Sequence, residues 1–88
     1  MLEQINNKKV NVNKFILKPN DSTGIHVHSF DYVIIPITDG NLKIVDKNKN
    51  ELITNLVAGE PYFRKKGVEH NVINIGTNII IFIEVEIK

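Results

Sequence analysis

The chain has 88 residues, a formal net charge of +1 at pH 7 and no cysteine. This length allows a single domain over residues 1–88, and the absence of cysteine excludes disulfides and thiolate metal ligands. The positive and negative charges are balanced, no apolar run approaches the roughly 20 residues of a membrane span, and residues 1–9 contain no signal-peptide core. We therefore expect a soluble, cytoplasmic protein with neither a nucleic-acid nor a membrane partner.

Short β-strands separated by turn residues account for most of the sequence. Runs of β-branched and aromatic residues are bounded by Gly, Pro, Asn and Asp, and no helical periodicity competes with them. From the N-terminus, we expect about eight strands, at residues 10–18, 23–28, 31–38, 41–45, 51–57, 62–65, 69–75 and 79–87. The strongest hairpin signal is Asp39-Gly40. This succession of short strands predicts an all-β sandwich or barrel.

The last predicted strand combines an apolar run with two acidic residues. The run from Ile79 to Ile83 has to be paired on both sides, since an exposed edge of this kind promotes aggregation. Glu84 and Glu86 alternate with Val85 and Ile87. We expect the Glu84 carboxylate to lie in solvent, with a role as a metal ligand as the less favoured alternative.

All three histidines of the chain fall in two short segments, residues 24–28 and 67–74. His26 and His28 are two residues apart, and in a strand this spacing puts both imidazoles on the same face. His70 follows a glycine turn, from which another strand can bring it alongside the first two. Imidazole is the commonest protein ligand for first-row divalent metals, so three converging rings predict a mononuclear site with open positions.

The spacing of these segments resembles the two motifs of the cupin superfamily. The first motif runs from a glycine through His-x-His and a glutamate to a closing glycine, and the corresponding residues here are Gly24, His26, His28 and Gly40. The second motif is a glycine, five residues, then Pro-x-Gly-x-x-His-x-x-x-Asn; Lys65 replaces the proline, and the matching residues are Gly59, Gly67, His70 and Asn74. The resemblance covers residues 24–74. It implies a double-stranded β-helix, that is, a jelly-roll barrel, with the histidines as metal ligands.

The glutamate ligand of the first motif has no counterpart in this sequence. The motif spacing places Tyr32 or Val33 at that position. Asp31 is the nearest carboxylate, but a regular strand turns it away from the face of His26 and His28, so a bulge would be needed to bring it to a metal. The resemblance therefore implies a three-histidine site, or one completed by Tyr32, Asp31 or water. The superfamily also has metal-free members.

Three further residues are candidates for contacting a substrate. Tyr32 shares the strand phase of the neighbouring histidines, so either its hydroxyl enters the cavity as a candidate catalytic group or its ring belongs to the core. Arg64 is the only arginine of the chain and would capture a carboxylate or phosphate, unless it is an exposed edge residue. Asn74 shares the strand face of His70 and either contacts the substrate or supports the strand geometry.

We therefore expect a metal-binding barrel with one divalent transition-metal ion, for which Fe, Zn, Ni, Cu and Mn are all compatible with nitrogen ligands. Such an ion would support oxygenase- or isomerase-type chemistry on a small polar metabolite. The alternative is a non-catalytic barrel that binds or senses a small-molecule ligand, with a structural metal or none. A chain this short gains stability from a partner subunit, and we expect a homodimer paired through residues 10–18 or 79–87.

Overall fold

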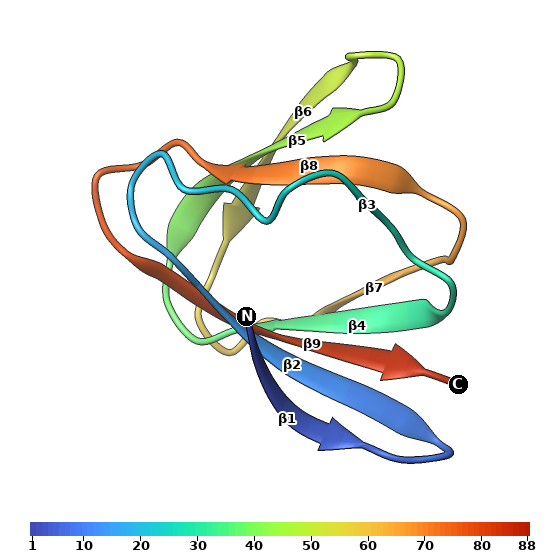
Figure 1. Ribbon diagram of the computed structural model, residues 1–88. Coiled ribbons are helices and arrows are strands. Elements are labelled where there is room, and N and C mark those ends of the chain that lie inside the picture. Colours follow the sequence, from blue (N-terminus) through green and yellow to red (C-terminus); the bar gives the residue numbers. More distant parts are fainter.

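Nine β-strands and no helix make up the computed structural model, which describes residues 1–88 (Figure 1). The strands in chain order are β1 (Leu2–Asn6), β2 (Val10–Leu17), β3 (His26–Val27), β4 (Asp31–Pro36), β5 (Gly40–Asp46), β6 (Glu51–Leu56), β7 (Tyr62–Arg64), β8 (Glu69–Asn74) and β9 (Ile80–Ile87). No helix capable of crossing a bilayer is present.

The strands form two antiparallel sheets that face each other across the interior (Figure 1). The first sheet has the order β1-β2-β9-β4-β7, and the second has the order β3-β8-β5-β6. Strands that follow one another in the chain mostly lie in opposite sheets, as β4 and β5 do, and also β8 and β9. The all-β barrel predicted from the sequence is confirmed.

Every second side chain of a strand points into the space between the sheets. In β4, Tyr32, Ile34 and Pro36 are buried, while the residues between them are half-exposed. Period-two alternation of this kind follows from the pleat of a strand. The buried apolar cluster draws on both sheets and consists of Leu17, Tyr32, Ile34, Leu42, Leu56, Val72, Ile80 and Phe82.

The inward-facing side chains of the first sheet change from apolar to polar along β9. Ile80 and Phe82 are the first inward-facing residues, and Glu84 is the next. The cross-strand partners on β2 repeat this change, because Phe15 is opposite Phe82 and Asn13 is opposite Glu84. The two phenylalanine rings stack with their centroids 5.0 Å apart. One end of the barrel is thus filled with packed hydrocarbon, and the other carries the polar groups of the candidate site.

Two features of the chain differ from the sequence-based expectations. β1 was not predicted, because its residues are short in β-branched side chains and all exposed; it pairs only with β2. Asp39-Gly40 does not close a hairpin, since β4 and β5 belong to different sheets. Asp39 instead accepts a hydrogen bond from the Ala58 N–H at 2.8 Å. Gly40 is required by close packing, because a Cβ there would lie 2.6 Å from the Ile80 side chain.

The strand edges expected to pair across a dimer axis are already occupied. β2 lies between β1 and β9, and β9 lies between β2 and β4. The apolar run of β9 is therefore paired on both sides, as predicted. A homodimer formed by edge pairing of residues 10–18 or 79–87 is incompatible with this topology, so a dimer has to use another surface.

Candidate metal centre

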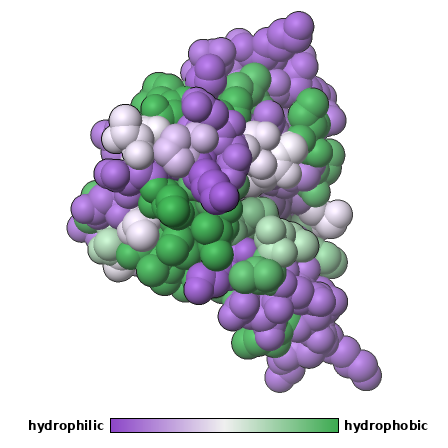
Figure 2. Space-filling model, turned by 60° about the vertical axis from the view of Figure 1, so that its left-hand side comes forward, coloured by the Kyte–Doolittle hydropathy of each residue, from purple (hydrophilic) through white to green (hydrophobic).

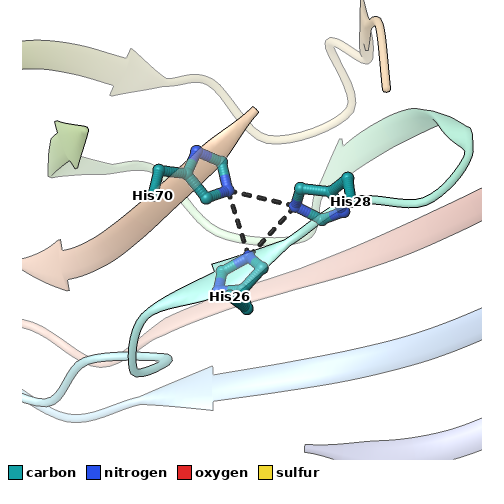
Figure 3. Close-up of side chains that lie close together, drawn as sticks. All are labelled: His26, His28 and His70. Atoms are coloured by element: carbon teal, nitrogen blue, oxygen red, sulfur yellow. Dashed lines mark hydrogen bonds between the residues drawn. The ribbon is translucent and has the colours of Figure 1, made fainter. Parts of the chain in front are cut away.

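Three histidine rings meet at the polar end of the barrel (Figure 3). His26 of β3 and His70 of β8 are directly opposite each other, and His28 follows two positions after His26. The Nε2 atoms of the three rings are 3.0 Å apart in each pair. Figure 3 shows these nitrogens pointing toward a common centre. The structure thus brings together the three residues that the sequence proposes as metal ligands.

Hydrogen bonds fix the orientation of the His26 ring. Its Nδ1 lies 2.9 Å from the carbonyl oxygen of Gly24, and a carbonyl only accepts, so Nδ1 carries the proton. The Nε2 atom of the neutral ring then carries a lone pair that faces the other two histidines. Gly24 has a φ of +82°, a left-handed conformation that glycine adopts readily. This glycine therefore places the carbonyl that orients a candidate ligand.

Burial keeps the other two rings neutral. His28 and His70 are 3% and 6% exposed. Burial, followed by the neighbouring His26 and His70 rings, lowers the pKa of His28 to about 4. Burial, followed by the His26 ring, lowers the pKa of His70 to about 4. Near neutral pH both imidazoles are uncharged, which is the form that coordinates a metal.

This donor set fits one divalent transition-metal ion. Imidazole nitrogens bind such ions at about 2.0–2.1 Å, and three nitrogens at that distance in mutually perpendicular directions are about 2.8–3.0 Å apart. The observed separations are 3.0 Å. With His26 as the neutral tautomer whose Nδ1–H donates to the Gly24 carbonyl, the three contacts share at most two hydrogens, so hydrogen bonding alone does not satisfy the cluster. A cation satisfies all three lone pairs at once.

Asp31 and Tyr32 are the two residues considered in place of the missing motif glutamate. Asp31 accepts a hydrogen bond from the Lys66 backbone N–H at 2.9 Å, so it is turned away from the histidines, as strand alternation predicts. The Tyr32 ring is buried and stacks on His28 with 3.8 Å between centroids. Burial, followed by the charge of Glu84, raises the pKa of Tyr32 to about 12, so the phenol stays protonated. In the metal-free chain, Tyr32 therefore supports the His28 ring as a protonated phenol.

The expectation that Glu84 is solvated is wrong. The residue is 6% exposed, and its Oε2 lies 3.9 Å from Nε2 of His28. Burial, followed by the neighbouring Glu86, raises the pKa of Glu84 to about 7. Since His28 is neutral, the contact between them is not an ion pair. Glu84 continues the inward series of Ile80 and Phe82 on β9, a direction that the sequence alone does not define.

A cavity of about 230 Å³ adjoins the three histidines, and Arg64 lies on its rim. Leu42 and Phe82 belong to the apolar part of its wall. The Arg64 guanidinium lies 4.4 Å from the centre of the Tyr62 ring, and its Nη1 donates to the Phe63 carbonyl at 2.9 Å. Arg64 is exposed and also lines the cavity, so it combines the two alternatives considered for it.

Asn74 lies outside the cavity and is fully buried. Its side-chain nitrogen donates to the carbonyls of Leu17 at 2.9 Å and Asn78 at 2.8 Å. Its side-chain oxygen accepts from the Gly76 N–H at 2.9 Å. These bonds tie the turn between β8 and β9 to the end of β2. The position corrects the substrate-contact role suggested for Asn74 and matches the structural alternative.

Comparison with known proteins gives near full-length relationships, although no protein-family model matches the chain. It is 45% identical over 85 residues to the beta-alanine degradation protein BauB of Pseudomonas aeruginosa, which covers 97% of this chain and 88% of the relative. A solved cupin domain from Bordetella pertussis is 41% identical, with a TM-score of 0.92 and coverage of 98% of this chain and 88% of that one. An RmlC-like cupin with a double-stranded β-helix fold from Methanocaldococcus jannaschii is 17% identical, with a TM-score of 0.82. The match covers 98% of this chain and 76% of the cupin from M. jannaschii, and it shows a likeness of fold alone.

Proposed function

The chain belongs to the cupin superfamily, and we propose that it is a metal-binding member in which His26, His28 and His70 hold one divalent transition-metal ion. The observation that carries this proposal is the convergence of three Nε2 atoms at 3.0 Å beside a cavity. Nitrogen donors are compatible with Fe, Zn, Ni, Cu or Mn. The ion that is bound in the cell depends on metal supply as well as on affinity.

The proposed activity is oxygenase- or isomerase-type chemistry on a small polar metabolite. When bound, a divalent ion supplies a Lewis acid or a redox centre at the histidines. The chain supplies the remaining functions. Arg64 on the rim presents N–H groups to an anionic part of the metabolite, and the apolar wall at Leu42 and Phe82 excludes water from the cavity. Tyr32 holds the His28 ring by stacking, and its protonated hydroxyl is the proposed hydrogen-bond donor to the bound molecule.

The similarity to BauB gives this chemistry a metabolic context. That relative is named for β-alanine degradation, and it is 45% identical to this chain. We propose a comparable catabolic role, in the cytoplasm, for this protein. A cavity of about 230 Å³ limits the metabolite to a small molecule.

A homodimer is also part of the proposal, with the outer face of the first sheet as its interface. The outward positions of this sheet are apolar on neighbouring strands: Ile16 is opposite Ile81, and Val33 is opposite both Val85 and Phe63. Ile16 and Phe63 are 45% and 50% exposed. Figure 2 shows hydrophobic side chains gathered in a broad patch in its lower half. A largely apolar face of this kind, interrupted on β2 by Lys14, is typical of a surface that a second copy covers.

Turnover assays on metal-loaded protein test the proposed activity. The protein is loaded separately with Fe(II), Zn(II) and Mn(II) and incubated with small carboxylates and amino acids, and oxygen uptake and product formation are followed. We expect turnover with at least one metal, reduced tenfold or more in Tyr32→Phe at unchanged metal content. Thermal stabilisation by a ligand without any turnover would instead support the non-catalytic barrel that binds or senses a small molecule.

A further inference from the structure

Two opposite charges in the cavity lack a charged partner within the chain. Glu84 is buried beside the Glu86 carboxyl group, and its only neighbour of basic type is the neutral ring of His28. Arg64 has no carboxylate partner, since the only other ion pair of the chain joins Lys43 and Glu51. Both Glu84 and Arg64 line the same cavity. A buried carboxylate without a cation is costly, so this cavity is complementary to a ligand that brings the missing charges.

The strand register separates the two charges by a short distance. β4 lies between β9, which carries Glu84, and β7, which carries Arg64. Ile34 is opposite Glu84 on one side and Tyr62 on the other, and Arg64 is two residues beyond Tyr62, opposite Tyr32. Two strand spacings correspond to about 10 Å between the backbones of β9 and β7. Side chains that point into the cavity from these strands therefore bracket a gap suited to a molecule of a few atoms.

Glu84 lies beside the histidine cluster and not within it. The ligand nitrogens of His26, His28 and His70 all lie within 4.8 Å of one another, whereas Glu84 shares such a group only with His28 and Glu86. Glu84 also lines the cavity, so a ligand in the cavity contacts this side chain. The rings of Tyr32 and Tyr62 also line the cavity; Tyr32 stacks on His28, and the Arg64 guanidinium lies over Tyr62.

We propose that the cavity selects a small zwitterion, with its carboxylate bound by Arg64 and its ammonium group bound by Glu84. This inference rests on the proposed function, because it names the class of metabolite presented to the histidine site. The planar guanidinium of Arg64 suits a carboxylate, and an ammonium donor compensates the buried Glu84. A ligand with only one of the two charges leaves the other protein charge unpaired, and it should bind more weakly.

Binding of three probes of similar size tests this assignment. β-Alanine carries both charges, propionate only the carboxylate and propylamine only the ammonium group. Isothermal titration calorimetry on the metal-free protein, repeated with zinc bound, should show β-alanine binding tenfold or more tightly than either of the others. Glu84→Gln should remove the preference over propionate, and Arg64→Gln should remove the preference over propylamine. Glu3→Gln and Lys65→Gln, both at exposed positions, are the matched controls and should change nothing.

Each failure has a separate meaning. Equal affinity for the three probes, no binding of any of them at millimolar concentration, or an unchanged preference in both variants overturns the zwitterion site. A Glu84→Gln variant with at least thirtyfold weaker zinc binding would assign the carboxylate to the metal and also overturn it. If wild-type protein takes up no zinc, the proposed metal function fails; the same titrations on metal-free protein then decide the zwitterion site alone.

Discussion

His26 and His70 face each other across the antiparallel pair of β3 and β8, with their Nε2 atoms 3.0 Å apart. β3 has only two residues, so its position depends on this pairing and on the turn at Gly24. A ligand site built across two strands exists only in one register, because a slip of one residue turns each side chain to the other face. The site and the local strand pairing therefore depend on each other.

Replacing Gly24 by alanine should weaken metal binding about tenfold or more, since groups that orient a metal-ligating histidine typically matter by this amount. The Gly24 carbonyl accepts the His26 Nδ1 proton, and its φ of +82° disfavours any Cβ. Gly59→Ala is the matched control, because Gly59 has a φ of +80° and, like Gly24, has open space where a Cβ would lie. Both variants should lose similar stability in the metal-free form. Equal metal affinity in the two variants would show that Gly24 does not orient the ligand.

Metal-free protein should lose stability as the pH falls from about 6.5 toward 4. The folded-state pKa values of His28 and His70 are lowered to about 4, so the unfolded chain binds up to two more protons than the folded chain in this range. Glu84 opposes this, because its folded pKa is raised to about 7 from 4.5 and it releases a proton on unfolding. The net dependence approaches about 1.4 kcal/mol per pH unit.

Urea unfolding of chelator-treated protein between about pH 4.5 and 6.5 measures this dependence. A His28→Gln/His70→Gln variant should lose the destabilisation at low pH, because the two groups responsible are gone. The expectation fails if wild-type protein becomes more stable as the pH falls through this interval.

The Glu84→Gln variant should be more stable than wild type in the metal-free form at about pH 8, by at most about 3 kcal/mol. The raised pKa of Glu84 means that its contribution is favourable below 4.5 and is lost as the pH rises through about 7. Glutamine mimics the protonated carboxyl group, so the difference should vanish below about pH 4.5. Denaturant titrations at both pH values measure it. Glu3→Gln, at an exposed position, should stay within about 0.5 kcal/mol of wild type, and a Glu84→Gln variant that behaves like it would contradict the burial of a charge at this position.

The proposed dimer predicts a mass of twice the 10.0 kDa chain in light scattering at micromolar concentration. Ile16→Glu places a charge on the apolar outer face of the first sheet and should give a monomer. Ile53→Glu is the control, since Ile53 is 54% exposed but belongs to β6 of the second sheet. Monomeric wild-type protein, or a dimer disrupted equally by both changes, would exclude the first sheet as the interface.

The sequence predicts the barrel and the histidine cluster because both depend on local periodicity. His26 and His28 share a face through a spacing of two residues, and the spacing of glycines, His70 and Asn74 marks the second motif. Glu84 was misplaced because alternation defines two faces of a strand without saying which one is inside. A buried carboxylate conflicts with the usual rule that charges lie in solvent, and only the packing of β9 between β2 and β4 resolves it.

The role of Asp39-Gly40 was misread for a related reason. An Asp-Gly pair predicts a reversal of the chain, but it does not say whether the following strand pairs with the preceding one or crosses to the other sheet. Likewise, the sequence could not show that β9 is a central strand, and so it suggested edges for dimerisation that are occupied. Both the path of the chain after Asp39-Gly40 and the central position of β9 depend on which strands pair over long sequence distances. The local alternation of apolar and polar residues does not encode that pairing.

Metal content of protein purified without chelators tests the central claim most directly. Elemental analysis should find about one equivalent of a divalent transition metal per chain, and His26→Ala and His70→Ala, each confirmed as folded by circular dichroism, should contain almost none. Asn71→Ala, beside His70 in sequence, should retain the metal. Wild-type protein that is free of metal and takes up none of the added divalent ions, or histidine variants that keep a full equivalent, would contradict the account.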